Sequence, residues 1–219
     1  MKERVLKDDV FRSFLVDGAR FSGCMEFPAL IANSAVPSSL TEFRRLKQPN
    51  TDNQYIHFYL HDKKFESVYR NPNRYLSWFR RFAGIIGFDF SSQVECPLYK
   101  QVECFGRNRE LSFWFARQGI SVIPNVRWGN KETFSWCFDG LPKRSTVAVS
   151  TLGCSKSTHD RQFFMDGFLE MLTRIEPKVV VVYGTKSEKM FPPLFTYITN
   201  TEVVFFESQY TISHRKEVA

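Results

Sequence analysis

The chain has 219 residues, of which 43% are hydrophobic and 24% charged, a composition typical of globular proteins. No run of about 18 apolar residues occurs and no apolar leader follows the N-terminus, so we expect neither membrane spans nor secretion, but a protein of the cytoplasm. The net charge of +7 favours polyanionic partners in general, and five cysteines without a Cys-x-x-Cys pair argue against disulfides and structural zinc.

Helical spacing of apolar residues predicts an N-terminal helix over residues 5–15. Seven short runs rich in β-branched and aromatic residues follow and predict strands, at 28–32, 56–60, 85–88, 122–124, 146–149, 179–183 and 203–206. Between them, helical periodicity with capping and stop signals predicts helices at 74–82, 97–118 and 159–175. We expect one α/β domain over residues 1–212 and a frayed polar tail over 213–219.

Strands separated by helices must cross over, which produces parallel pairing with the helices outside. About seven strand–helix units favour a TIM-like β/α barrel, closed or incomplete. An open doubly wound parallel sheet is the alternative. No Gly-x-Gly-x-x-Gly or Gly-x-x-x-x-Gly-Lys-Ser/Thr motif occurs, so dinucleotide and P-loop nucleotide binding lose support.

In either architecture the carboxyl ends of the strands converge, so polar residues that follow strands are candidates for a site. Asp62 and Asp89 follow consecutive strands and can share a divalent cation or divide acid and base roles. The alternative is that each aspartate only caps a helix or a turn. We identify no other cofactor.

Further candidates for ligand binding follow the same strands or lie on the long helix. Arg127 beside Trp128 pairs a cation with an aromatic face, which suits a phosphate and a stacked base, or else forms a packed rim. Arg107 and Arg109 can grip an anion or form helix-face salt bridges. The remaining candidates are His61, Ser91, Asn125, Ser150, Thr151 and Tyr183.

Several motifs in a fixed order carry a family likeness. They are His-Phe-Tyr-Leu-His-Asp at 57–62, Asn-Pro at 71–72, Asp-Phe-Ser at 89–91, Arg-Asn-Arg at 107–109, the segment 119–128, Cys-Phe-Asp-Gly at 137–140, the segment 147–153 and Val-Tyr-Gly at 182–184. With them, roughly residues 20–185 resemble the domain of unknown function family 4417, found in bacteria, phages and other mobile elements. The resemblance implies a protein of a phage or plasmid in the bacterial cytoplasm and supplies no catalytic residues.

Two functional hypotheses remain open. The first is an enzyme that uses Asp62 and Asp89 at the strand ends, with Arg127 holding a nucleic acid, a nucleotide or another phosphate-bearing ligand. The second is a non-catalytic binding or accessory protein that acts on nucleic acid or on a host or replication protein. Its support is the net charge of +7 without a recognisable catalytic motif. The basic clusters 44–47 and 80–81 among aromatic residues would supply the surface, although solvated helix faces explain them better.

Overall fold

The computed structural model describes residues 9–49, 51–154, 157–184, 186, 190–191, 200–209 and 211. The strands are β1 (Phe21–Ser22), β2 (Phe27–Pro28), β3 (Ser39–Glu42), β4 (Gln54–His57), β5 (Gly84–Ile86), β6 (Val122–Ile123), β7 (Thr146–Ser150), β8 (Val179–Tyr183) and β9 (Glu202–Phe206). The α-helices are α1 (Glu66–Arg70), α2 (Leu76–Phe79), α3 (Leu98–Arg117) and α4 (Thr158–Ile175). Short 3-10 helices are η1 (Ser13–Val16), η2 (Phe43–Arg45), η3 (Asp62–Lys64), η4 (Pro72–Tyr75) and η5 (Lys131–Ser135). The predicted tail over 213–219 lies outside the described residues.

Two parallel sheets form the centre of the fold. One has the strand order β3-β4-β5-β6 and the other the order β7-β8-β9, with every neighbouring pair parallel. A parallel bridge between Asn125 and Ala148 connects the two sheets just beyond β6. The predicted α/β class and the parallel pairing of successive strands are therefore confirmed.

The strand order follows the sequence and does not reverse, as it would at the switch point of a doubly wound sheet. A barrel also requires its last strand to pair with its first. Among the described strands no pairing joins β9 to β3, so closure of the predicted barrel is not found.

Side chains of β4 and of the two residues that follow it alternate between two cores, as the period of an extended chain requires. Ile56 and Phe58 join an apolar cluster with the helices, whereas Tyr55 and Tyr59 join a third cluster with Tyr183, at the end of β8. That third cluster draws residues from both sheets, so the sheets face each other across a shared interior.

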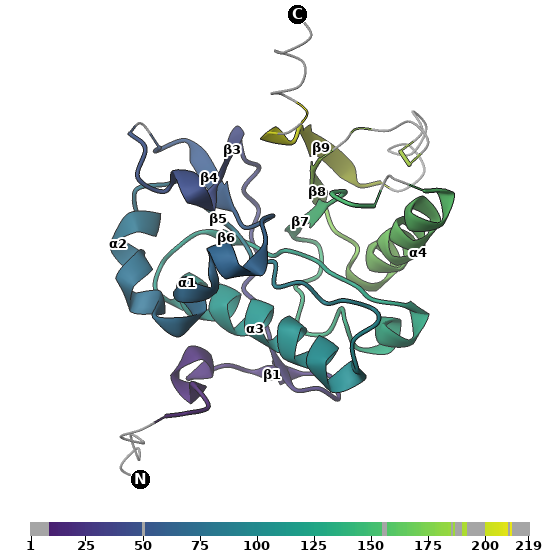
Figure 1. The fold of residues 1–219 in the computed structure, drawn as a ribbon, viewed down its shortest axis with the longest axis horizontal. Helices are drawn as coiled ribbons and strands as arrows, with labels where there is room; N and C mark the ends of the chain where they lie inside the picture. The colour runs from purple at the N-terminus through teal and green to yellow at the C-terminus, as the bar shows by residue number, and fades with distance from the viewer. Residues whose placement is uncertain are drawn as a thin grey trace, which may run out of the picture.

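The helices cover the outer faces of the sheets (Figure 1). α1 and α2 flank the β3–β6 sheet, α4 packs beside β7–β9, and α3 crosses beneath the strands of the first sheet. The predicted helices 97–118 and 159–175 agree with α3 and α4 to within one residue at each end. None of the helices in the described part of the chain combines the length and apolar character that a membrane span needs.

The prediction that residues 28–32 form the first parallel strand is wrong. Residues of the predicted strand 28–32 belong in part to an antiparallel ribbon, in which Phe27–Pro28 pairs with Phe21–Ser22. The first parallel strand is instead Ser39–Glu42, whose polar residues gave no apolar run to detect. Because strand pairing depends on distant partners, local composition did not distinguish the two segments.

The predicted N-terminal helix is also wrong where the structure describes it. Residues 5–8 lie outside the described residues, and residues 9–12 are not helical. Only the 3-10 helix Ser13–Val16 forms, directly after Arg12, whose positive φ of 57° breaks a right-handed helix. The predicted helix 74–82 is shorter than expected, since η4 and α2 share this segment.

Candidate functional site at the carboxyl ends of the strands

The carboxyl ends of the parallel strands bring together polar residues that lie far apart in sequence. Asp89 follows β5, and its carboxylate lies beside Arg127, which follows β6. The charge of Asp62, which follows β4, acts on both Asp89 and Arg127. Ser150, at the end of β7, lines the same pocket as Arg127. Parallel strands with sequential neighbours produce this convergence.

Asp89 is the centre of a hydrogen-bond network. Arg127 Nη1 lies 3.0 Å from Oδ1 and 3.3 Å from Oδ2 of the carboxylate. Asn125 Nδ2 donates to Asp89 Oδ1 at 2.8 Å and to the Phe88 carbonyl at 3.0 Å. The Tyr59 hydroxyl donates to Asn125 Oδ1 at 3.1 Å. Tyr59, from the cluster between the two sheets, thus completes the network.

Burial and charge act in opposite directions on this pair. The Asp89 side chain is 9% exposed, and burial raises the pKa of its carboxyl group, against the lowering effect of Arg127 and Asn125. Asp89 in turn raises the pKa of Arg127. The Arg127 side chain is 30% exposed, and its Nε and Nη2 make no hydrogen bond within the described residues. The pair therefore holds the guanidinium at Nη1 and leaves Nε and Nη2 available.

Asp62 is bound by a neighbouring loop residue. Ser91 donates its backbone N–H to Asp62 Oδ2 at 3.1 Å and its hydroxyl to Oδ1 at 3.0 Å. His61 is exposed and accepts a hydrogen bond from the Lys63 backbone at its Nδ1. His61, Asp62 and Ser91 line a shallow polar hollow of about 320 Å³ together with Gln93.

The two aspartates do not present the ligand set that a divalent cation favours. Each carboxylate already accepts hydrogen bonds, Asp89 from an arginine and Asp62 from Ser91. Within the described ranges, no group of three or more His, Cys, Asp or Glu side chains could hold a metal ion. A cation shared by Asp62 and Asp89 thus stays a prediction, and we derive no chemistry from it.

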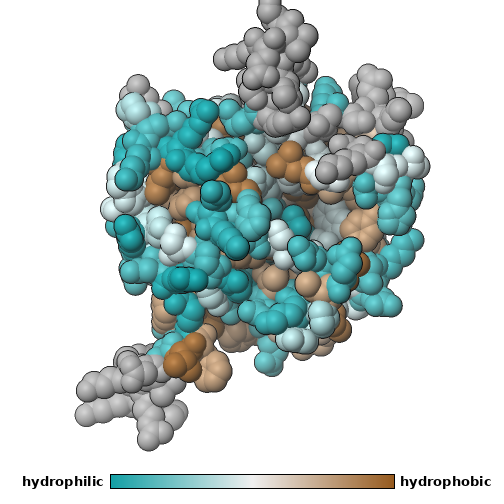
Figure 2. Space-filling view, viewed as in Figure 1, coloured by the Kyte–Doolittle hydropathy of each residue, from teal (hydrophilic) through white to brown (hydrophobic). Residues whose placement is uncertain are grey.

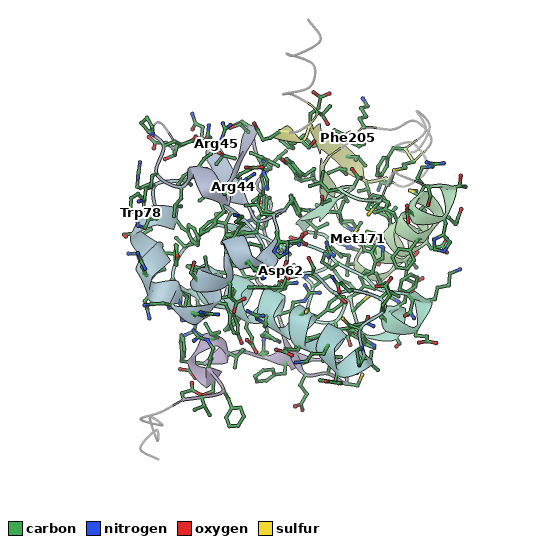
Figure 3. The ribbon with its side chains drawn as sticks, in the orientation of Figure 1. Arg44, Arg45, Asp62, Trp78, Met171 and Phe205 are labelled. Atoms are coloured by element: carbon green, nitrogen blue, oxygen red, sulfur yellow. The ribbon has the colours of Figure 1, made fainter. Side chains whose placement is uncertain are left out.

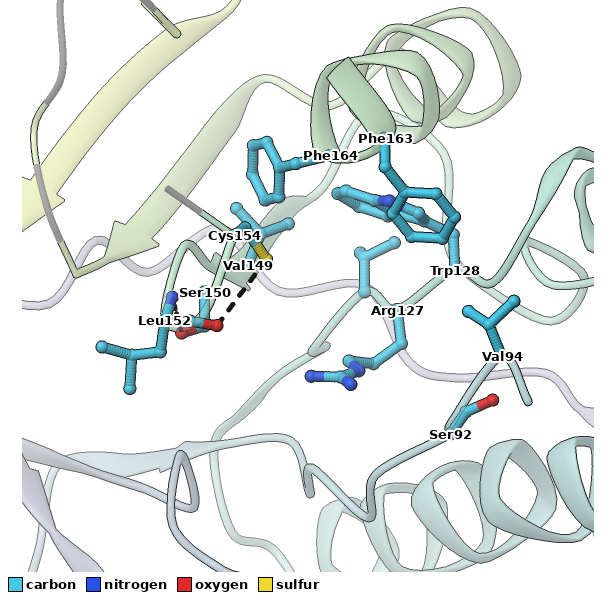
Figure 4. Close-up of a pocket in the computed structure, with 11 residues that line it drawn as sticks. Ser92, Val94, Arg127, Trp128, Val149, Ser150, Leu152, Cys154, Phe163 and Phe164 are labelled. Carbon is cyan, nitrogen blue, oxygen red and sulfur yellow. Dashed lines mark hydrogen bonds between the residues drawn. The ribbon is translucent and has the colours of Figure 1, made fainter. Parts of the chain in front are cut away.

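A cavity of about 130 Å³ opens beside Arg127 (Figure 4). One wall is aromatic and is formed by Trp128, Phe163 and Phe164, with the last two on α4. Cys154 lies beside Phe164, Ser150 and Leu152 lie farther from Trp128, and Ser92 and Val94 complete the lining near Arg127. The Ser92 Oγ atom is buried and has no hydrogen-bond partner within the described residues. An orphaned hydroxyl in a pocket wall is a donor available to a ligand.

Close packing fixes the position of Trp128. A Cβ atom built on Gly167 of α4 would lie 2.2 Å from Trp128 Cδ1, so only glycine lets the indole approach the helix this closely. The Trp128 ring also lies 5.2 Å from the ring of Phe164, centroid to centroid. The aromatic wall is therefore built by helix packing before any ligand arrives.

The structure does not bring Arg107 and Arg109 to the pocket wall. Arg107 pairs with Glu66 and lies over the rings of Tyr69 and Phe90. Arg109 is 2% exposed, and burial lowers its pKa to about 10. It donates to the backbone carbonyls of Asn125, Cys137 and Asp139, which gives it a structural role in holding three segments together.

Thr151 and Tyr183 lie at the end of the second sheet, beside the pocket. The Thr151 backbone N–H donates to the Tyr183 carbonyl at 3.0 Å. The Tyr183 hydroxyl accepts a hydrogen bond from the Gln209 backbone, and its ring stacks on Tyr59 at a centroid distance of 5.2 Å. Tyr183 belongs to the apolar cluster shared by the two sheets, and neither Thr151 nor Tyr183 lines the cavity.

Sequence reasoning missed several residues of this site. Tyr59 carries a signal, because it alternates with Phe58 and so points to the interior from the end of a strand. Phe163 and Phe164 lie in the predicted helix 159–175, and the local sequence does not show that they face a pocket. Ser92 and Cys154 lie a few positions after the residues that end their strands. The rule that polar residues following strands are site candidates could have identified them.

Comparison with known proteins shows that the chain is similar in sequence to phage proteins. A family model described as "Domain of unknown function (DUF4417)" matches residues 19–202. The Gene 1 protein of Mycobacterium phage D29 is 32% identical over 166 residues, which cover 74% of this chain and 62% of that protein. The Gene 1 protein of Mycobacterium phage L5 is 31% identical over 166 residues, which cover 74% of this chain and 72% of that protein. This chain thus spans about three fifths of the D29 relative. No solved structure matches.

Proposed function

Since the chain belongs to the DUF4417 family and is related to phage proteins, we propose that it binds a phosphate-bearing ligand with an aromatic ring at the carboxyl ends of its strands. The observation that carries the proposal is the guanidinium of Arg127, held by Asp89 at Nη1, with Nε and Nη2 making no hydrogen bond within the described residues, beside an aromatic wall. A fixed arginine fork suits phosphate oxygens, and the Trp128 face suits a planar base.

The size of the cavity limits how much of the ligand enters. A cavity of about 150 Å³ holds one benzene ring, so the 130 Å³ beside Trp128 admits a single ring or a similar group. The rest of the ligand lies outside, along the mouth between the strand ends. We place this mouth at the end of an incomplete barrel, a proposal supported by the sequential strand order and by the interior shared between the sheets.

Asp89 has a positioning role in this proposal. A buried carboxylate that carries an ion pair and an Asn125 hydrogen bond keeps the arginine in one orientation. The ion pair also cancels the arginine charge, so the ligand is recognised by hydrogen bonds and stacking as much as by charge. We therefore propose a binding role and assign no reaction.

Isothermal calorimetry tests the proposal with thymidine 5′-monophosphate, thymidine and inorganic phosphate as probes. We expect Arg127→Met to weaken binding of the monophosphate at least tenfold, because a charge-assisted contact contributes roughly 1.5–3 kcal/mol. Trp128→Leu should weaken monophosphate binding and leave phosphate binding unchanged, since only the ring contact is lost. The exposed Arg20→Met is the matched control. Equal monophosphate affinity in the Arg127 and Arg20 variants would refute the proposal.

A further inference from the structure

We infer that the ligand of this pocket is single-stranded nucleic acid, whose backbone continues from the pocket over a basic corner formed by η2 and α2. This inference rests on the proposed function and names its substrate class. The basic corner consists of Arg44, Arg45, Lys47, Arg80 and Arg81.

The chain packs these cations into one corner although two segments supply them. Arg81 donates from Nη2 to the Gln48 carbonyl at 3.0 Å, and the Thr51 hydroxyl donates to the Arg81 carbonyl at 2.6 Å. Beneath them the rings of Phe43 and Phe79 lie 6.3 Å apart, which fixes η2 against α2. The two basic clusters of the sequence are therefore one surface.

Most of this charge is uncompensated. Arg44 pairs with Glu42 at 2.9 Å, but Arg45, Lys47, Arg80 and Arg81 form no ion pair within the described part of the chain. All four side chains belong to exposed residues. Residues 48–79, between the two clusters, contain Asp52, Asp62 and Glu66, of which Asp62 accepts hydrogen bonds from Ser91 and Glu66 pairs with Arg70 and Arg107. A cluster of unpaired exposed cations favours a polyanion, because its binding releases condensed counterions.

The η2 part of the corner lies at the same end of the molecule as the pocket, whereas Arg80 and Arg81 come just before β5 and lie toward the amino ends of the strands. η2 begins directly after Glu42, the last residue of β3, so it extends from a carboxyl strand end as Arg127 does. The charges of Glu42, Arg44 and Arg45 act on Tyr183, at the carboxyl end of β8. Figure 3 shows Arg44 and Arg45 on the same side of the ribbon, above Asp62. Hydrophilic residues cover this upper-left region of the surface (Figure 2).

An aromatic side chain stands among the cations. Trp78 of α2 is half-buried, and the Arg81 guanidinium carbon lies 5.3 Å from the centroid of its ring. Figure 3 places Trp78 at the edge of the fold, beyond the arginines. Alternating cations and aromatic faces bind single strands, since phosphates contact the cations and bases stack on the rings.

The pocket selects a single strand over other polyanions. Its ring-sized cavity beside Trp128 accepts a base only when the base is unpaired, which a duplex does not offer. An acidic peptide supplies charge for the corner but no planar base for the aromatic wall. The two surfaces together therefore fit a strand that has both repeating phosphates and free bases.

Fluorescence anisotropy with a labelled single-stranded oligothymidylate, at roughly 50 and 200 mM salt, tests the inference. The variant Arg45→Gln/Lys47→Gln/Arg80→Gln removes three cations of the corner. Its control, Arg20→Gln/Lys143→Gln/Lys178→Gln, removes three exposed cations elsewhere, two of them just before β7 and β8. We expect the corner variant to bind at least about tenfold more weakly at low salt, with a salt slope shallower by about 2. The control should change affinity less than about threefold, and both should melt as cooperatively as the native chain.

The arms of the experiment separate the two proposals. Equal weakening by the corner and control variants overturns the inference, as does equally tight binding of a duplex or of polyglutamate. Thymidine 5′-monophosphate should bind the corner variant as it binds the native chain. Monophosphate binding that depends on Arg127, together with an oligonucleotide affinity that the corner variant lowers no more than the control does, would leave the proposed function standing and overturn the inference. If Arg127→Met changes neither ligand, the proposed function fails.

Discussion

The Asp89 carboxylate and the Arg127 guanidinium meet through one nitrogen, since Arg127 Nη1 lies within 3.3 Å of both carboxylate oxygens. The end-on contact holds the arginine in place and leaves Nε and Nη2 without a hydrogen bond among the described residues. Residues from the ends of neighbouring strands thus form one polar centre.

We expect Asp89 and Arg127 to be coupled energetically. In a double-mutant cycle with Asp89→Asn and Arg127→Met, the coupling in the free energy of unfolding should be about 1–3 kcal/mol, because the carboxylate is buried. Urea unfolding at neutral pH measures it. The exposed pair Arg144 and Glu176, with side chains 74% and 51% exposed, is the control and should show less than about 0.5 kcal/mol. Similar coupling for both pairs would contradict a buried centre.

Asn125 should contribute more to stability than its size suggests. Its amide donates to the Phe88 carbonyl and to Asp89, and accepts from Tyr59. Asn125→Ala leaves these buried groups unsatisfied, so we expect a loss of about 2–4 kcal/mol in urea unfolding. The exposed Asn73→Ala should change stability by less than about 0.5 kcal/mol. A loss below about 1 kcal/mol for Asn125→Ala would mean that water replaces the network.

Two helix glycines should respond in opposite directions to alanine. Gly167→Ala forces a methyl group against Trp128, so we expect a loss of about 1–3 kcal/mol and weaker binding of thymidine 5′-monophosphate. At Gly106 of α3, a Cβ would meet only Phe27 Cε1 at 4.0 Å. Gly106→Ala should therefore stabilise the chain by about 0.5–1 kcal/mol, by helix propensity alone. Thermal unfolding and calorimetry check both, and stabilisation by Gly167→Ala would disprove the tight contact.

His57 should make the protein sensitive to mild acid. The side chain is buried with Nδ1 unpartnered among the described residues, its ring centroid lies 4.1 Å from that of Tyr183, and burial lowers its pKa to about 3. The unfolded chain binds a proton near pH 6.5 and the folded chain does not, so stability falls as pH decreases from about 6.5 toward 3.

The size of this effect follows from the two pKa values. Between about pH 7.5 and pH 5, His57 should account for a loss of about 2 kcal/mol in the free energy of unfolding. His57→Phe cannot take up the proton and should lose about that much less than the native chain over the same interval. Urea unfolding at both pH values measures the difference. An unchanged pH dependence in His57→Phe would show that this histidine is protonated without cost.

The amino-acid sequence determined the elements whose signals are local. The helical period and the capping and stop residues of α3 and α4 predicted both helices to within one residue at each end, and the apolar run 179–183 predicted a strand, which β8 confirms with the same bounds. The rule that parallel strands converge at their carboxyl ends also predicted that Asp62, Asp89 and Arg127 lie near one another, as the Asp89–Arg127 ion pair and the effect of the Asp62 charge on both indicate, while their role in a ligand site stays a prediction. The motifs predicted the family, which the family model confirms.

Tertiary structure decided everything that depends on a distant partner. Phe27–Pro28 became an antiparallel ribbon, and Arg109 was buried against three carbonyls while Arg127 reached a pocket. A side chain shows the same local pattern whether its partner is a backbone carbonyl or an open cavity. Because those partners are brought together only when the sheets and helices pack, the division between structural and ligand-facing arginines is a property of the folded chain.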